Sequence, residues 1–219
     1  FAMNKMVRIA ALSTMLLVMV CSVAFASAKA SPTAEISTAH YTDRNVDLSY
    51  PQVTMANKKA EEKINGQIEA VVAQFKTGVQ ADMRQGGKIQ AAMKYDVRLN
   101  HTGLLSLTLS EYTYADKAAH GMTYVKGMTF NTDGELCTYA DVLKLAAVAK
   151  SEAAYSASAV TEKLKIKAAQ DGIVLNPDFK GLDAVTQEFY FDDETNLHIL
   201  FQPYEVAPYA AGVIDLKIQ

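Results

Sequence analysis

The sequence predicts an α+β fold in which one long N-terminal helix and a central helical segment pack on an antiparallel sheet. Apolar residues recur with a helical period after Asn57, and they recur at every second position in several later segments. Turn signals such as Asp133-Gly134 separate these later segments. A long helix followed by short alternating strands is typical of an antiparallel sheet with one buried face.

The long helix is predicted to begin at Asn57 and to end at Gly86-Gly87. Its apolar residues are spaced by three or four positions and share one face: Ile64, Ile68, Val71, Phe75 and Val79. Before the helix, residues 46–50 alternate between apolar and polar side chains up to Pro51. This pattern predicts an edge strand, because proline has no N–H to donate to a neighbouring strand.

Residues 91–110 alternate on both sides of a turn at 100–103, which predicts a β-hairpin with one buried face. A third strand is predicted at residues 122–130. Asp141 lies three positions after Thr138, as in a variant of the capping box that begins a helix. A further helix is predicted at 151–170, followed by strands at 186–191, 197–201 and 213–218.

The N-terminus has the pattern of a secretory signal peptide over residues 1–28. Lys5 and Arg8 precede an apolar run from Ile9 to Phe25, and small residues suitable for a signal peptidase follow at 26–30. The rival interpretation is an uncleaved anchor, because the run falls only slightly short of the roughly 18–20 residues that span a bilayer. Cleavage predicts an exported protein, periplasmic, cell-surface or extracellular, with no remaining membrane span.

The domain organisation follows from this reading of the N-terminus. Phe1 and Ala2 precede Met3 and are interpreted as a scar at the start of the signal peptide. Residues 31–42 are polar and small, carry Pro32 and show no apolar period, which predicts a flexible leader over residues 29–45. Residues 46–219 are predicted to form a single α+β domain, and we expect a monomer. A chain of this length buries enough apolar surface to fold without disulfides.

Charge and cysteine content exclude several classes of function. Loss of residues 1–28 removes two basic residues and no acidic one, so the net charge falls from −3 to about −5. A mildly acidic chain without a Lys/Arg block is not expected to bind nucleic acid, because that affinity depends on neutralising phosphates. Cys137 is the only cysteine after the signal peptide, so no internal disulfide is expected.

Two motifs do not look like ordinary core sequence. The first is the loop from Tyr112 to Gly121, in which Ala118-Ala119-His120-Gly121 precedes a strand. The second is Pro203-Tyr204-Glu205-Val206-Ala207-Pro208-Tyr209-Ala210, followed by Gly212. Together with their spacing they resemble the extracellular domain family of the lysozyme-sensing anti-sigma factor RsiV and the peptidoglycan deacetylase PdaC. The first motif departs from the usual Gly-Gly-Ala-His of that family, and the second matches closely. The resemblance extends over residues 46–218.

The resemblance implies a module that faces the cell envelope. One member of the family binds lysozyme, and others accompany enzymes that act on peptidoglycan. We expect this chain to be a stand-alone module without a sigma-factor-binding or a deacetylase domain. The hypothesis that carries over is recognition of a lysozyme-type muramidase or of a peptidoglycan glycan.

Four residues in the two motifs are candidates for binding: His120, Tyr204, Glu205 and Tyr209. Both tyrosines have side chains that stack on sugars or anchor protein partners, although they could instead pack the two proline bends. His120 could act as an acid/base or as a ligand, or could simply hydrogen-bond to the backbone. Glu205 could pair with His120 or with a ligand hydroxyl.

Enzymatic activity is the alternative hypothesis, as a cell-wall hydrolase that uses His120 and Glu205. The sequence lacks a nucleophile elbow, a zinc-binding His-Glu-x-x-His helix and a phosphate loop, so no catalytic residue and no cofactor is assigned. A second alternative is a structural envelope protein. The acidic run at 192–194 is predicted to be a hairpin turn and not a metal site, and no role is assigned to the other histidines: His40, His101 and His198.

Overall fold

The computed structural model describes residues 33–149 and 152–218 of the chain, so the predicted signal peptide lies outside the described residues. The described part is a mixed α+β fold with two antiparallel-rich sheets and three α-helices, as the sequence predicts in outline. The elements in order are β1 (Glu35–Asp43), β2 (Val46–Thr54), α1 (Lys58–Arg84), β3 (Ile89–His101), β4 (Leu104–Ala115), β5 (Met122–Asn131), α2 (Tyr139–Ala149), η1 (Glu152–Tyr155), α3 (Ala157–Asp171), β6 (Phe189–Phe191), β7 (Leu197–Phe201), η2 (Tyr209–Ala211) and β8 (Ile214–Ile218).

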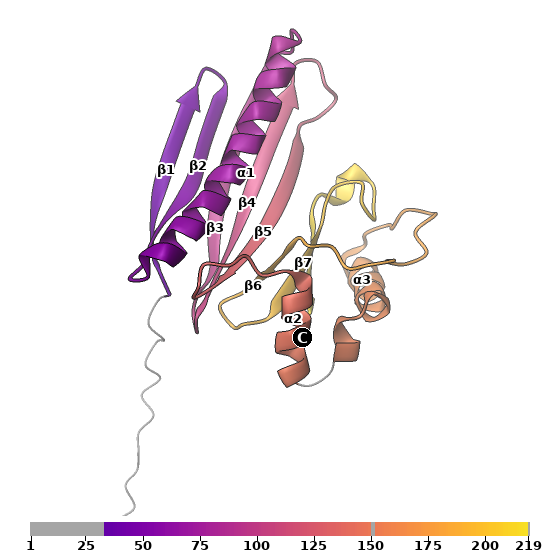
Figure 1. The fold of residues 1–219 in the computed structure, drawn as a ribbon. Helices are drawn as coiled ribbons and strands as arrows, with labels where there is room; N and C mark the ends of the chain where they lie inside the picture. Colours follow the sequence, from indigo (N-terminus) through magenta and orange to yellow (C-terminus); the bar gives the residue numbers. More distant parts are fainter. Residues whose placement is uncertain (1–32, 150–151, 219) are drawn as a thin grey trace, which may run out of the picture.

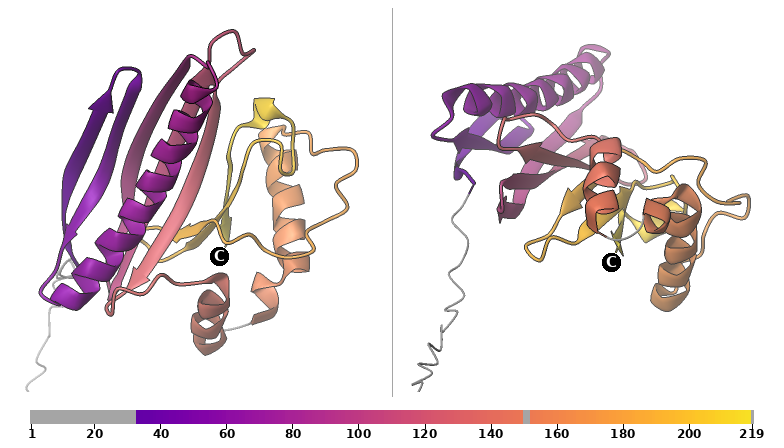
Figure 2. Two further views of the ribbon diagram at one scale, coloured as in Figure 1. Left: turned by 45° about the horizontal axis from the view of Figure 1, so that its top comes forward. Right: turned by 60° about the horizontal axis from the view of Figure 1, so that its bottom comes forward.

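The first sheet has five strands in the order β1-β2-β3-β4-β5, and α1 lies along one of its faces (Figures 1 and 2). The sheet is not purely antiparallel, because β2 and β3 pair in parallel over Val46–Leu48. This pairing follows from the connection: α1 carries the chain back over the sheet, and a strand that follows such a crossover runs parallel to the strand before it.

The helix expected from Asn57 is α1. The Asn57 side chain accepts from Ala60 N at 3.2 Å, which caps the helix, and Glu61 accepts from Met55 N at 2.7 Å. Its buried residues face the first sheet: Ala60, Ile64, Ile68, Val72 and Val79. Because two strands precede it, α1 is not the N-terminal element of the fold.

The flexible leader predicted at residues 29–45 is wrong for Glu35–Asp43, which form β1. β1 pairs antiparallel with β2 along its whole length. Its residues are mostly exposed, so the strand has no apolar alternation that a sequence pattern could reveal. Backbone pairing with the otherwise free edge of β2 holds this strand in place.

β2 is therefore an inner strand, and the edge position predicted from Pro51 is wrong. The proline is tolerated because the pairing with β3 covers only Val46–Leu48, so Pro51 lies beyond it. At Val53 the Asn65 side chain of α1 takes the place of a strand. Asn65 Oδ1 accepts from Val53 N and Nδ2 donates to Val53 O, both at 2.8 Å.

The predicted hairpin is β3 and β4, joined by Thr102 and Gly103, which both have positive φ as a two-residue hairpin turn requires. β4 is buried on both faces, whereas the sequence predicts one. Ser106 and Thr108, which alternate with the apolar residues of β4, are covered by the second sheet. Ser106 Oγ lies 2.7 Å from Thr129 Oγ1 and accepts from Phe191 N at 2.9 Å.

The second sheet has three antiparallel strands, β6-β7-β8, and forms a separate core with α2 and α3. The capping box predicted at the start of α2 is present: Thr138 N donates to Asp141 Oδ2 at 2.9 Å, and Asp141 N donates to Thr138 Oγ1 at 3.3 Å. The second predicted helix is divided into η1 and α3, and α3 ends at Gly172 with φ +69°.

The two sheets meet at the edge of β5. Gln202 Nε2 donates to Val125 O at 2.8 Å, and Gln202 Oε1 accepts from Val125 N at 2.9 Å. Two residues further along β5, Gly127 N donates to Glu188 Oε2 at 2.9 Å. A Cβ at Gly127 would overlap the backbone of Phe189, so glycine allows the sheets to touch.

No helix in the described part of the chain is long and apolar enough to cross a membrane.

We predict that Gly127→Ala lowers the free energy of unfolding by at least about 2 kcal/mol, because the added methyl forces the two sheets apart. Urea denaturation followed by circular dichroism measures this change. Gly66→Ala is the control, since a Cβ there meets nothing within 4 Å, and helix propensity should stabilise the protein by up to ~1 kcal/mol. Equal stability of the Gly127→Ala variant and the unmodified protein would contradict the assigned contact.

Candidate functional site

The loop between β4 and β5 places His120 beside the second sheet. Asp116 N donates to Lys88 O at 2.8 Å and Ala118 N to Ala115 O at 2.9 Å, which fixes the start of the loop. His120 is half-buried. Its Nδ1 lies 3.0 Å from Gly121 O, and because a carbonyl only accepts, Nδ1 carries a proton.

The second motif begins with a tight turn after β7. Glu205 N donates to Gln202 O at 3.0 Å, and the Glu205 carboxylate accepts from Gln202 N at 2.7 Å. Within this turn Tyr204 has φ +70°, which is unusual for a residue with a side chain. The backbone thereby directs the tyrosine away from the core, while Val206 and Ala207 are buried.

Three aromatic rings from the two motifs meet in a cluster. Tyr209 stacks on His120 with 3.6 Å between ring centroids and 17° between ring planes. Tyr204 OH lies 3.1 Å from His120 Nε2, and its ring centroid lies 5.8 Å from that of Tyr209. Tyr209 OH donates to Gly121 O at 2.7 Å. We name His120, Tyr204 and Tyr209 the aromatic cluster.

The aromatic cluster presents one exposed ring, that of Tyr204, beside the stacked rings of His120 and Tyr209. Tyr204 is 53% exposed, whereas the His120 and Tyr209 rings are partly covered. Gly121 lets the Tyr112 ring lie against the loop, because a Cβ at this position would overlap that ring. Three of the four residues predicted for binding are thus in mutual contact.

Glu205 lies in the same segment but has another contact. No hydrogen bond or ion pair joins it to His120 among the described residues. Removal of water by neighbouring groups raises the pKa of the Glu205 carboxyl, although the hydrogen bond from Gln202 N opposes this rise. In this structure Glu205 closes the turn that presents Tyr204.

This arrangement is suited to recognition. An exposed tyrosine ring that neighbouring rings hold in place can stack on a sugar or enter a partner's pocket at low entropic cost. Acid–base chemistry by His120 would need a second positioned group, and its two nitrogens already contact Gly121 O and Tyr204 OH. In residues 33–149 and 152–218, no group of three His, Cys, Asp or Glu is placed to hold a metal ion.

A second polar cluster, which the sequence pattern missed, lies on the second sheet. Tyr190 OH donates to Asp215 Oδ2 at 2.5 Å, and His198 Nδ1 lies 2.7 Å from Asp215 Oδ1. His198 Nε2 lies 3.2 Å from Asp192 Oδ2, so the ring is held between two carboxylates. Arg98 from β3 lies over the Tyr190 ring at 5.0 Å, which connects this cluster to the first sheet.

Sequence reasoning assigned no role to His198, because its partners lie on the neighbouring strands and in the turn after β6, where strand register decides which side chains meet. The antiparallel register β7–β8 sets His198 opposite Lys217, and β6–β7 sets it opposite Tyr190. The hairpin turn predicted at residues 192–194 is present, and Asp192 closes it by accepting from Asn196 N at 2.8 Å. Period-two alternation in three short strands was the available signal that these polar residues share one face.

The charges in this cluster shift one another's pKa values. Burial alone would lower the pKa of His198, but the hydrogen bonds and charges of Asp215 and Asp192 raise it overall. Burial likewise opposes the charged form of both carboxyls, yet hydrogen bonds from His198, Tyr190 and Asn196 hold their pKa values below the usual range. The folded state therefore favours a protonated His198 between ionised acids.

Two family profiles match the chain. The profile described as "Deacetylase PdaC" matches residues 39–123, and the profile described as "Protein of unknown function (DUF3298)" matches residues 139–219. Two consecutive regions of the chain are therefore similar to two different domain families. This confirms the resemblance inferred from the two motifs. The PdaC-type match runs from within β1 through β2, α1, β3 and β4 to the start of β5, and it includes His120. The DUF3298 match includes Tyr204, Glu205 and Tyr209, so the aromatic cluster joins the two matched regions.

Solved structures show the same fold. A DUF3298 family protein from Bacteroides fragilis superposes with a TM-score of 0.56 at 15% identity and covers 87% of this chain and 92% of its own. A DUF3298 family protein from Pseudomonas aeruginosa superposes with a TM-score of 0.52 at 15% identity and covers 87% of this chain and 91% of its own. The comparison with curated proteins gives no match.

We predict that the stability of the protein declines as pH rises through the folded-state pKa of His198. This pKa is raised on folding, so its contribution is complete below the unfolded-state value and is lost above the folded-state value. The carboxyls act in the opposite direction, since their contribution is lost as pH falls through their depressed pKa values. Urea denaturation at a series of pH values measures both limbs.

His198→Gln keeps a polar side chain but cannot titrate, so it should remove the decline on the alkaline side of the ordinary histidine pKa. His40→Gln is the matched control, since His40 is exposed and lies on β1. An unchanged pH profile in His198→Gln would show that the assigned contacts contribute nothing.

Proposed function

We propose that this chain is an exported binding module of the cell envelope. In this module Tyr204, supported by His120 and Tyr209, recognises a lysozyme-type muramidase or a peptidoglycan glycan. The observation that carries the proposal is the exposed Tyr204 ring, held out by a left-handed backbone conformation beside the His120–Tyr209 stack. Unfavourable backbone conformations of this kind are concentrated at functional sites.

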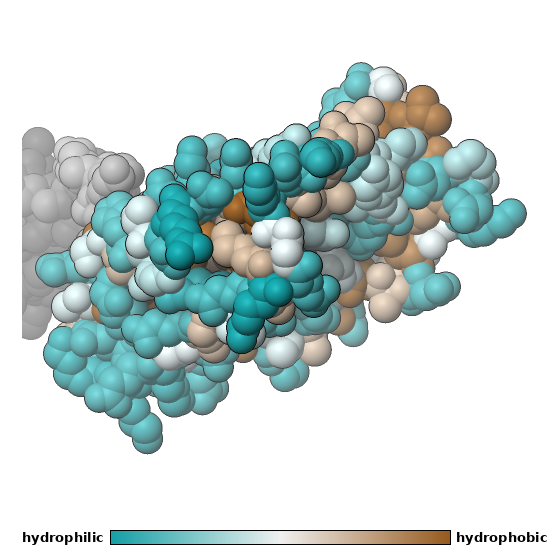
Figure 3. All heavy atoms as spheres, turned by 90° about the horizontal axis from the view of Figure 1, so that it is seen from above, coloured by the Kyte–Doolittle hydropathy of each residue, from teal (hydrophilic) through white to brown (hydrophobic). Residues whose placement is uncertain are grey.

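The character of the surface also supports a recognition role. The surface in Figure 3 is mostly hydrophilic, with small apolar patches. An exposed aromatic ring within such a surface can provide a large share of the affinity for a partner. The charge of about −5 expected after signal cleavage leaves this surface free of strong attraction to polyanions.

The geometry gives less support to the alternative hydrolase. A carboxylic acid and a histidine that share a catalytic task need to lie near one reacting atom. Here the Glu205 carboxylate bonds Gln202 N, whereas the His120 ring bonds Gly121 O and Tyr204 OH. No observation favours a purely structural role in the envelope.

We predict that Tyr204→Ala weakens binding at least tenfold while the free energy of unfolding changes little. The substitution removes the ring but keeps a residue with a Cβ at the same φ. Isothermal titration calorimetry against a C-type lysozyme, and separately against soluble peptidoglycan fragments, measures the affinity. A shift in one titration only identifies which partner is recognised.

Ile166→Ala is the control, because Ile166 is 58% exposed on α3. The substitution shortens a surface side chain of comparable exposure. It should leave both titrations unchanged. If the unmodified protein binds neither a lysozyme nor any peptidoglycan fragment, the proposed function is wrong.

A further inference from the structure

A pocket lies between α1 and the first sheet, on the α1-covered face. Its volume is about 350 Å³, which is in the range of small-ligand sites. Successive turns of α1 over residues 74–82 form one wall of the pocket. Residues of β4 and β5 form its floor. Gln74, Gly78 and Asp82 line the pocket from α1, and Glu111, Tyr124 and Lys126 line it from the sheet.

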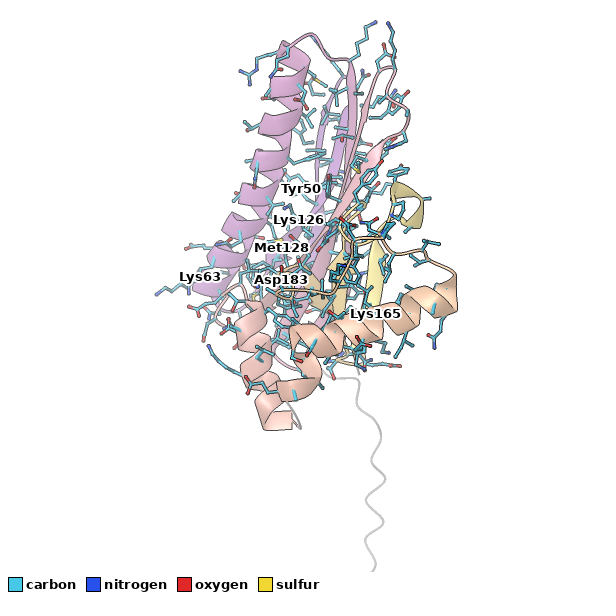
Figure 4. The ribbon with its side chains drawn as sticks, turned by 90° about the vertical axis from the view of Figure 1, so that its right-hand side faces the viewer. Tyr50, Lys63, Lys126, Met128, Lys165 and Asp183 are labelled. Carbon is cyan, nitrogen blue, oxygen red and sulfur yellow. The ribbon has the colours of Figure 1, made fainter. Side chains whose placement is uncertain are left out.

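Strand register explains why these side chains converge. Glu111 pairs with Tyr124 across β4–β5, so the two side chains lie next to each other on one face. Glu111 also pairs with Met93, which is buried beneath α1. Figure 4 shows α1 along one side of the sheet that carries Lys126. The pocket is thus on the helix side of the sheet, and the second sheet packs on the other side.

Gly78 keeps the pocket open. A Cβ at this position would meet nothing within 4 Å, although the residue lies in the interior of a long helix. Glycine in such a position costs helix stability relative to alanine. Tyr124 gives the other side an aromatic wall that is 45% exposed.

Glu111, which lines the pocket, has an unsatisfied polar atom. Its Oε1 is shielded from solvent and has no hydrogen-bond partner among the described residues. A shielded carboxyl oxygen without a partner is costly, and such groups need an explanation. Burial raises the pKa of this carboxyl, while the nearby Lys126 charge opposes the rise. Glu111 forms no ion pair with Lys126 in the described structure.

We propose that this pocket binds one ring of a saccharide. The lining combines hydrogen-bond donors and acceptors of both kinds, which suits hydroxyl groups: the Gln74 amide, the Thr113 hydroxyl, the Lys126 ammonium and the Asp82 and Glu111 carboxyls. The exposed Tyr124 ring offers the flat apolar surface on which a sugar face packs.

The lining carries charges of both signs, and these side chains offer a ligand hydroxyl both acceptors, at Asp82 and Glu111, and a donor, at Lys126. A small rotation of Glu111 would turn its unpartnered oxygen toward a ligand hydroxyl, which would satisfy an atom that is otherwise orphaned. The site is distinct from the aromatic cluster, and the proposal does not depend on the function proposed for Tyr204.

The test is an NMR titration of the ¹⁵N-labelled protein with cellobiose, maltose and chitobiose. We expect at least one disaccharide to shift the amide signals of Gly78, Thr113 and Lys126. Gly78→Leu should fill the pocket and reduce the affinity more than tenfold. Gly66→Leu is the matched control on the same helix, since a Cβ at Gly66 also meets nothing within 4 Å, and it should bind as the unmodified protein does.

A second variant separates ligand binding from folding. Glu111→Leu removes the unsatisfied oxygen, so it should raise the midpoint of urea denaturation while it weakens saccharide binding about tenfold. A purely structural glutamate would change the stability without changing the affinity.

Two results would overturn the proposal. One is the absence of shifts with all three disaccharides at millimolar concentration. The other is a set of shifts confined to the loop around His120 and Gly121, which would place a glycan at the aromatic cluster and leave the pocket as a solvent-filled cleft.

Discussion

The close contact between β5 and the second sheet is the constraint on which the remaining structure depends. Gly127 lets the backbone of Phe189 approach, and Glu188 and Gln202 bond the exposed edge of β5 with their side chains. The N–H and C=O of Val125 and the N–H of Gly127 are thereby satisfied without another strand. The Phe189 backbone can approach β5 this closely only at a residue without a Cβ. Gly127 therefore determines where along β5 the second sheet packs.

The candidate site follows from that contact. Gln202 is the residue that bonds Val125, and the segment that carries Tyr204 and Tyr209 begins directly after it. Glu205 bonds back to Gln202 N, so the turn that presents Tyr204 is tied to the same residue that joins the sheets. The aromatic cluster thus lies where the PdaC-type and DUF3298 regions meet, and neither region alone could assemble it.

Much of the fold could be predicted from local patterns, and the site only in part. The long apolar face of α1, the β3–β4 turn and the Thr138–Asp141 cap depend on residues close in sequence. β1 and the two buried faces of β4 could not be predicted, because partners distant in the chain decide them. Tyr204 and Tyr209 could be singled out by their motif, but their contact with His120, and the pairing of His198 with Asp215, depend on strand register.

The most direct measurement is native-state amide hydrogen exchange at Val125 and Gly127, compared between the unmodified protein and Gln202→Ala. In the unmodified protein both amides should exchange only through unfolding of large parts of the chain. In Gln202→Ala the Val125 amide should exchange much faster, together with loss of the nuclear Overhauser contacts between the His120 and Tyr209 rings. Fast exchange at both amides in the unmodified protein, or ring contacts that persist in Gln202→Ala, would contradict the claim that this contact positions the site.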